Sequence, residues 1–287
     1  MKKIIKWILL VMVIFLTTGC RLFRDNLDGA KIYTTVYPIQ FLVEKLYGNH
    51  STITSIYPTG ADINSYVLTK KQIKDYAKGD LFIYTGLSSE KNIAKSLINQ
   101  NHNLLIIDVS NGLNYNNSVE ELWLSPNNFL MLAKNIKDNL NEYLTSKIIK
   151  NEVNEEYEEL AEKLSLMDAN LRNIANDAKK KNKETIIVNN DIFLFLEDYG
   201  FDVISLDIDT VSNSTLSHVK SLFKNKKQKN MIVLNDEIDN NLKNIIKTYD
   251  VKKINVSDLI YNTSKTDDYI EQMKKFIVNL QNITIGN

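Results

Sequence analysis

Cysteine is almost absent from this chain of 287 residues, which contains a single one, Cys20. One thiol excludes an internal disulfide and a cluster of thiolate metal ligands. Proline and histidine are also scarce, with three of each. Charge of one sign is missing too, because 35 basic residues balance 35 acidic ones and no basic tract occurs. The chain therefore offers no tract of the kind that binds nucleic acid, and its stability must come from packing.

The only cysteine follows a short apolar run near the N-terminus. Lysines precede this run at residues 7–16, and small residues at 17–19 separate it from Cys20. The run is well short of the roughly 20 residues that a helix needs to cross a bilayer. Positive, apolar and small-residue segments in this order predict a secretory signal peptide.

The same arrangement resembles a bacterial lipoprotein signal, in which the cysteine after the cleavage point is acylated and becomes the new N-terminus. The resemblance implies that residues 1–19 are removed and that acylated Cys20 anchors the protein to the lipid bilayer outside the cytoplasm. Residues 20–29 then form the lipidated cysteine and a polar tether. Thr17 departs from the leucine that is usual at its position, and an ordinary signal peptide with an incidental cysteine is the alternative.

From residue 30 onward, short apolar or β-branched runs alternate with amphipathic stretches. This alternation predicts an α/β fold of (βα)-type lobes with mainly parallel sheets. A capping box at Thr69 and Gln72, and the pair Ser125-Pro126, predict two helix starts. A closing helix is expected at residues 266–282. The predicted strands lie at residues 31–36, 52–57, 81–85, 104–108, 185–188, 203–206, 231–234 and 253–256.

The longest periodic segment lies between the two groups of strands. Apolar residues recur there at intervals of three and four, which gives one apolar stripe on a helix at about residues 152–181. A coiled coil is the alternative, but α/β units flank the stripe on both sides. We therefore predict one long rigid helix between two lobes. The expected parts are an N-terminal lobe at 30–147, a connecting helix at 148–182 and a C-terminal lobe at 183–287.

Polar residues follow several predicted strands, where the ligands of open α/β sheets bind. Asn189 to Asp191 follow one strand, Ser257 and Asp258 follow another, and Asp62 and Asn64 follow a third. Glu120 and Glu121 precede a tryptophan. Taken singly, each of these is more often a turn or cap residue than a ligand.

The order of five motifs changes that reading. The chain resembles the zinc- and manganese-type solute-binding proteins of bacterial ABC importers, whose two lobes are joined by one long helix. The resemblance implies capture of a divalent metal ion in the cleft between the lobes, delivery to an ABC permease, and no catalysis. The residues that carry it are 33–38, 57–66, 80–87, 122–126 and 267–273.

The resemblance also implies a set of metal ligands, and here the chain departs from the family pattern. Asn64 and Glu121 stand at positions where the family usually has histidine, and Asn190 and Asp258 match the other two positions. No histidine falls on a ligand position. Oxygen ligands suit harder cations such as manganese, whereas imidazole suits zinc. We therefore expect a divalent metal as transported ligand, with manganese favoured over zinc.

Two other functions stay open at this point. A surface interaction or adhesin-like lipoprotein on the same scaffold, with its metal site lost, is the main alternative, and the two asparagines at ligand positions favour it. An enzyme is not expected, because the sequence has no recognisable nucleophile–base pair and no glycine-rich phosphate loop. We expect a monomer whose partners are the metal ion, the permease and the bilayer.

Overall fold

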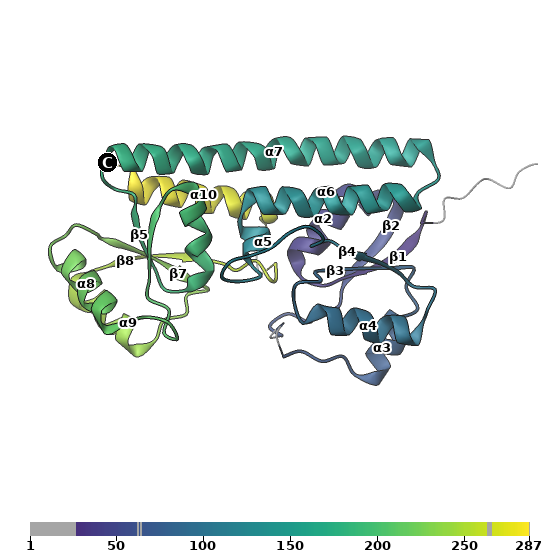
Figure 1. Ribbon diagram of the computed structural model, residues 1–287, viewed down its shortest axis with the longest axis horizontal. Coiled ribbons are helices and arrows are strands. Elements are labelled where there is room, and N and C mark those ends of the chain that lie inside the picture. The colour runs from purple at the N-terminus through teal and green to yellow at the C-terminus, as the bar shows by residue number, and fades with distance from the viewer. Residues whose placement is uncertain (1–26, 62, 64, 263–265, 287) are drawn as a thin grey trace, which may run out of the picture.

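The computed structural model describes residues 27–61, 63, 65–262 and 266–286, so Cys20 and the predicted signal peptide lie outside the described residues. Two four-stranded sheets lie side by side along the long axis of the molecule (Figure 1). Their strand orders are β2-β1-β3-β4 and β6-β5-β7-β8, and every strand pairing is parallel. The predicted class, two α/β lobes with parallel sheets and a long helix between them, is confirmed.

The N-terminal lobe builds its sheet from the first four predicted strands. The capping box is confirmed, since the Thr69 hydroxyl accepts from the Gln72 amide and the Gln72 side chain accepts from the Thr69 amide. The elements are β1 (Ala30–Thr34), α2 (Tyr37–Tyr47), η1 (Gly48–His50), β2 (Ser51–Ser55), α3 (Lys70–Tyr76), β3 (Leu81–Tyr84), α4 (Glu90–Gln100), β4 (Leu105–Asp108), α5 (Glu121–Leu124) and α6 (Pro126–Tyr143).

The C-terminal lobe repeats the pattern with the other four strands. Its closing helix begins after Asp268, whose carboxylate accepts from the Glu271 amide as an N-cap. The elements are β5 (Thr185–Val188), η2 (Asp191–Tyr199), β6 (Asp202–Ser205), α8 (Asn213–Lys224), β7 (Asn230–Leu234), α9 (Asn240–Tyr249), β8 (Lys252–Val256) and α10 (Tyr269–Thr284).

Helix α7 (Lys147–Lys180) runs unbroken along both lobes (Figure 1). At 1.5 Å per residue its 34 residues extend over about 50 Å. The predicted apolar stripe packs against the lobes, and its buried residues are Val153, Leu160, Leu164, Met167, Leu171, Ile174, Ala175 and Ala178. None of the described helices is both long and apolar enough to cross a membrane.

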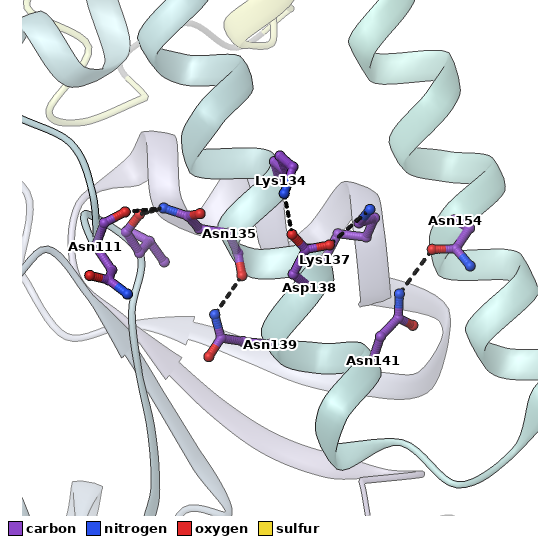
Figure 2. A network of polar contacts seen from close by, with 9 residues as sticks. Asn111, Lys134, Asn135, Lys137, Asp138, Asn139, Asn141 and Asn154 are labelled. Carbon is purple, nitrogen blue, oxygen red and sulfur yellow. Dashed lines mark hydrogen bonds and ion pairs between the residues drawn. The ribbon is translucent and has the colours of Figure 1, made fainter.

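Asparagines fix helix α6 to its neighbours (Figure 2). The Asn135 amide donates to the carbonyl oxygens of Val109 and Asn111, at 2.8 and 2.9 Å, and so holds the loop that follows β4. On the other side of α6, the Asn141 amide donates to the Asn154 side chain on α7 at 2.9 Å. These bonds fix the position of α6 between the N-terminal sheet and α7.

One hydrophobic core crosses the boundary between the lobes. It contains both sides of the N-terminal sheet, the buried stripe of α7, and the face of the C-terminal sheet under η2 and α10. Tyr269 at the start of α10 stacks on Phe129 of α6, with 4.0 Å between ring centroids. A second, smaller core lies on the other face of the C-terminal sheet, under α8 and α9.

Candidate functional site

A cavity of about 620 Å³ lies between the two lobes, at the carboxyl ends of the strands. Its N-terminal wall consists of Gly60, Ala61 and Ile63 from the loop after β2, together with Glu120 just before α5. The C-terminal wall comes from residues 235–237 after β7, from the last two residues of β8, and from residues 257, 258, 260 and 261 in the loop that follows β8. The position is the one that parallel sheets provide for a ligand.

Asp258 is the predicted ligand that lines this cavity. Its carboxylate accepts from the Asn235 side-chain amide at 2.8 Å and from the Ile260 amide at 3.0 Å. Its backbone carbonyl accepts from the Trp123 indole of the other lobe at 2.8 Å. The carboxylate is therefore held in place and half-buried at the boundary between the lobes.

Glu120 brings a second carboxyl group to the cavity, from the opposite lobe. Burial raises the pKa of Glu120, and the nearby charges of Asp258 and Glu121 raise it further. Two carboxylates that repel each other across a cleft are stabilised by a cation between them. This arrangement favours a bound cation in the cavity.

Glu121, the predicted ligand beside it, has a different environment. Its side chain is buried, and its carboxylate oxygens accept from the backbone amides of Asn116, Asn117 and Ser118 at 2.9, 2.8 and 3.3 Å. The Asn117 side chain donates a fourth hydrogen bond at 2.8 Å. In the described arrangement Glu121 thus holds the loop before α5.

Asn190 caps its own helix, because its side-chain oxygen accepts from the Ile192 amide at 3.0 Å at the start of η2. It does not line the cavity. Asn64 lies outside the described residues, although its neighbour Ile63 lines the cavity. The structure therefore brings Asp258 to the cleft and leaves the full ligand set a prediction.

The three histidines lie elsewhere. His50 pairs with Glu152 of α7 at 2.5 Å, and His102 and His218 are exposed on the surface. Among the residues that the structure describes, no group of three or more histidine, cysteine, aspartate or glutamate side chains is placed to hold a metal ion.

Sequence reasoning missed the loop after β7. Asn235, Asp236 and Glu237 line the cavity, and the first two have positive φ angles of 49° and 59°. Left-handed backbone is costly for residues other than glycine and concentrates at functional sites. The available signal was position, since this loop follows a predicted strand at the same edge of the sheet as Asp258.

The segment after β8 ties the lobes together beside the cavity. The Tyr37 amide donates to the Ile260 carbonyl at 3.0 Å, and the Tyr261 hydroxyl donates to the Ala61 carbonyl. The predicted helix start at Ser125-Pro126 is confirmed, and the Ser125 hydroxyl, which makes no cap bond, pairs with the Tyr199 hydroxyl of the other lobe at 3.1 Å. Bonds on several sides of the cleft oppose a wide opening of the lobes.

Two parallel-sheet lobes that share one long helix and enclose an acid-lined cavity define a two-lobed solute-binding protein. Residues 32–283 match the family model described as zinc-uptake complex component A, periplasmic (ZnuA), and the chain belongs to that family. The family consists of binding components of metal uptake, which confirms that the protein is not an enzyme.

Known relatives are distant in sequence. A Thermotoga maritima protein described as metal-binding is 22% identical over 205 residues, which cover 70% of this chain and 73% of that protein. The iron-binding protein YfeA of Yersinia pestis is 23% identical over 192 residues, 63% of this chain. That alignment spans 60% of YfeA, less than two thirds of its length.

Solved structures share the fold over most of the chain. The Zn(II)-bound ZnuA-like domain of Streptococcus pneumoniae AdcA superposes with a TM-score of 0.73 at 20% identity, covering 89% of this chain and 98% of that domain. The zinc-binding protein TroA of Treponema pallidum gives a TM-score of 0.68 at 16% identity, covering 89% and 99%. At these identities the likeness establishes the fold alone.

Proposed function

We propose that this protein captures a divalent metal ion between its lobes, outside the cytoplasm, and delivers it to an ABC permease. The observation that supports this most is the approach of two carboxyl groups, Glu120 and Asp258, to one cavity from opposite lobes. Asp236 and Glu237 also line the cavity, and Asp236 is paired with Lys253 at 2.8 Å, so the wall as a whole carries negative charge that suits a divalent cation. An ion held this way bridges the lobes, so the protein with metal and the protein without it differ in how the two lobes are held together.

The donor atoms favour manganese over zinc in this proposal. Glu120 and Asp258 offer carboxylate oxygens, and Asn235 holds Asp258 in place through hydrogen bonds with its carboxylate and its backbone amide. Such oxygen sets suit hard cations, whereas zinc prefers imidazole or thiolate ligands. Zinc is the metal named for AdcA and TroA, and iron for YfeA, so the metal has to be measured for this chain.

Glu120 joins the ligands expected from the family pattern. Of the set Asn64, Glu121, Asn190 and Asp258, we propose that Asp258 binds the ion directly, and Asn64, outside the described residues, stays a predicted ligand. We propose that Glu121 and Asn190 serve mainly to hold their loops, because both accept backbone hydrogen bonds and, unlike Asp258, neither lines the cavity.

Calorimetric titration of the metal-free chain with Mn²⁺ and Zn²⁺ tests this function. We expect Mn²⁺ to bind more tightly than Zn²⁺, and Asp258→Ala to abolish binding because it removes the carboxylate proposed as the direct ligand. His218→Ala is the matched control, because this histidine is exposed and far from the cavity in the fold. Zinc binding that depends on a histidine would contradict the proposal.

Membrane attachment through Cys20 is the second part of the proposal. Two acyl chains on one cysteine provide the double anchor that stable attachment requires. Cys20→Ala should move the protein from the membrane fraction to the soluble or secreted fraction. Unchanged partitioning of this variant would rule out the lipid anchor.

A surface interaction lipoprotein on the same scaffold is the second candidate. The observation that favours it is that the described residues hold no group of three acidic, histidine or cysteine side chains placed for a metal. Metal analysis of the purified protein separates the two candidates. Protein that purifies without metal and binds neither Mn²⁺ nor Zn²⁺ would support the interaction role.

A further inference from the structure

Three turns meet at the end of the C-terminal sheet that faces away from the cavity. They precede β5, β7 and β8, and hydrogen bonds hold them side by side. The Lys252 amide donates to the Lys229 carbonyl at 2.8 Å, and the Gln228 side chain donates to the Thr185 carbonyl at 3.0 Å. Lysines that are separated in the sequence are thereby gathered on one surface.

We call this surface the lysine face and define it by Lys181, Lys183, Lys226, Lys227, Lys229 and Lys252, all of which are exposed. Within the part of the chain that the structure describes, none of these six lysines forms an ion pair. Four acidic residues lie near it: Asp177, which is close enough to Lys181 to feel its charge, Glu184 and Asp250 beside the turns in the sequence, and Asp202, which accepts from the Thr185 hydroxyl. The face therefore carries a clear positive excess.

This excess is local. The three lysines of residues 1–19 are absent from the predicted mature chain, which then has more acidic than basic residues. The matching edge of the N-terminal sheet, before β2, β3 and β4, has Lys78 beside Asp80 and no lysine cluster. A negatively charged surface would thus attract the lysine face and orient this end of the molecule toward it.

The lysine face lies at the opposite end of the long axis from the start of β1 (Figure 1). Helix α7 spans this separation, and its 34 residues extend over about 50 Å. Leu27 is buried in the core of the N-terminal lobe, so only six residues separate it from Cys20, and this link spans at most about 25 Å when extended. A lipid at Cys20 therefore keeps the N-terminal lobe near the membrane but leaves the far end free to swing.

We propose that the lysine face binds the phosphates of anionic phospholipids in the membrane that carries the Cys20 anchor. Lysine ammonium groups bind phosphate as compact point charges, and a basic patch is an effective second attachment beside a lipid chain. With both ends held, the long axis lies along the membrane and the cleft keeps a fixed orientation toward a permease. The proposal goes beyond metal capture and rests only on the proposed anchoring.

Vesicle co-sedimentation tests it with the chain from Arg21 onward, which has no acyl group and includes every described residue. The vesicles contain phosphatidylcholine alone, or phosphatidylcholine and phosphatidylglycerol at a ratio of 3 to 1. The test variant is Lys183→Gln, Lys227→Gln, Lys229→Gln and Lys252→Gln together. The matched control changes four exposed lysines of the other lobe to glutamine, Lys70, Lys71, Lys74 and Lys91, for the same change in charge.

We expect binding only to the anionic vesicles, weakened at least about tenfold in the test variant and little changed in the control. Raising the salt concentration should release the bound protein. Equal loss in both variants, or no loss in the test variant, would overturn the proposal. Binding to soluble polyphosphate or nucleic acid without binding to anionic vesicles would overturn it as well. Melting curves and Mn²⁺ titration of both variants separate these outcomes from misfolding and from failure of metal capture.

Discussion

Each lobe has a parallel sheet of four strands, yet the two sheets contribute differently to the core that they share with α7. Both faces of the N-terminal sheet belong to the core that includes α7. In the C-terminal sheet only one face does: Ile186 and Val188 of β5 point into the shared core, whereas Ile187 between them points into the separate core under α8 and α9. Because successive side chains of a strand point to opposite faces of the sheet, this lobe has one layer that packs on α7 through the shared core. The layer on the other face, with α8 and α9, is the outer layer.

The backbone shows a second difference. All six described residues other than glycine with positive φ angles belong to the C-terminal half of the chain. Three border the cleft, Asn235, Asp236 and Leu259, and three lie in the turns of the opposite edge, Asn182, Lys226 and Asp250. The N-terminal lobe uses Gly29, Gly60 and Gly112 for such turns. Left-handed backbone outside glycine, mostly at Asn and Asp, therefore concentrates in the lobe that supplies most of the cavity wall.

Breaking the shared helix should have the largest effect. Leu164 is fully buried in the middle of α7, where a proline removes a hydrogen bond and the substitution also loses an apolar side chain. Together these cost about 5 kcal/mol. We expect Leu164→Pro to lower the melting temperature of both lobes together, as measured by circular dichroism. Leu166→Ala, at an exposed position, should melt like the unchanged protein. A Leu164→Pro protein with normal melting would contradict the shared core.

Loosening the outer layer should affect one lobe only. Phe223 of α8 is buried in the separate core, and its replacement by alanine costs about 4 kcal/mol. Native-state hydrogen exchange should become faster in α8 and α9 and stay nearly unchanged in α7. Lys224→Ala, at the exposed residue next to Phe223, is the control. Equal acceleration in both lobes would show that the two cores behave as one.

The N-terminal lobe should have its own dependence on pH. Glu90 is buried, accepts from the Thr85 amide and hydroxyl at 2.8 Å each, and burial raises its pKa to about 7. Because the folded-state pKa exceeds the ordinary value of 4.5 for a glutamate, this group favours folding below pH 4.5, and that contribution is lost as the pH rises through 7.

Glu90→Gln removes this titration while keeping an acceptor for Thr85. The unchanged protein should lose up to about 3 kcal/mol of its free energy of unfolding between pH 4.5 and 7 through Glu90. The Glu90→Gln variant should not show this loss. Urea denaturation at pH 5 and pH 8 measures the difference. Exposed Glu197→Gln should leave the slope intact. An unaltered slope in Glu90→Gln would mean that Glu90 is ionised at little cost.

Periodicity in the sequence was enough to predict the fold. A strand lies at each of the eight predicted positions, because alternating or apolar runs between turn residues have few other structures to adopt. The ligands could not be predicted as well. Glu120 and Glu121 are neighbours of the same chemical type, and only the fold shows that the first lines the cavity while loop amides surround the second. The lysine face is hidden for the same reason, since its lysines come from three separate turns.

The most direct measurement of the central claim compares these two glutamates in the presence and absence of Mn²⁺. Metal at about 100 times its dissociation constant should stabilise the unchanged protein by about 2.7 kcal/mol, visible as a rise in melting temperature. Glu120→Gln should lose this rise without lower stability in the metal-free form, because it removes a carboxyl group that burial and Asp258 disfavour. Glu121→Gln should melt earlier without metal, since it weakens the acceptor for three backbone amides, but should keep the rise. The reverse result, a rise lost in Glu121→Gln and kept in Glu120→Gln, would contradict the proposed site.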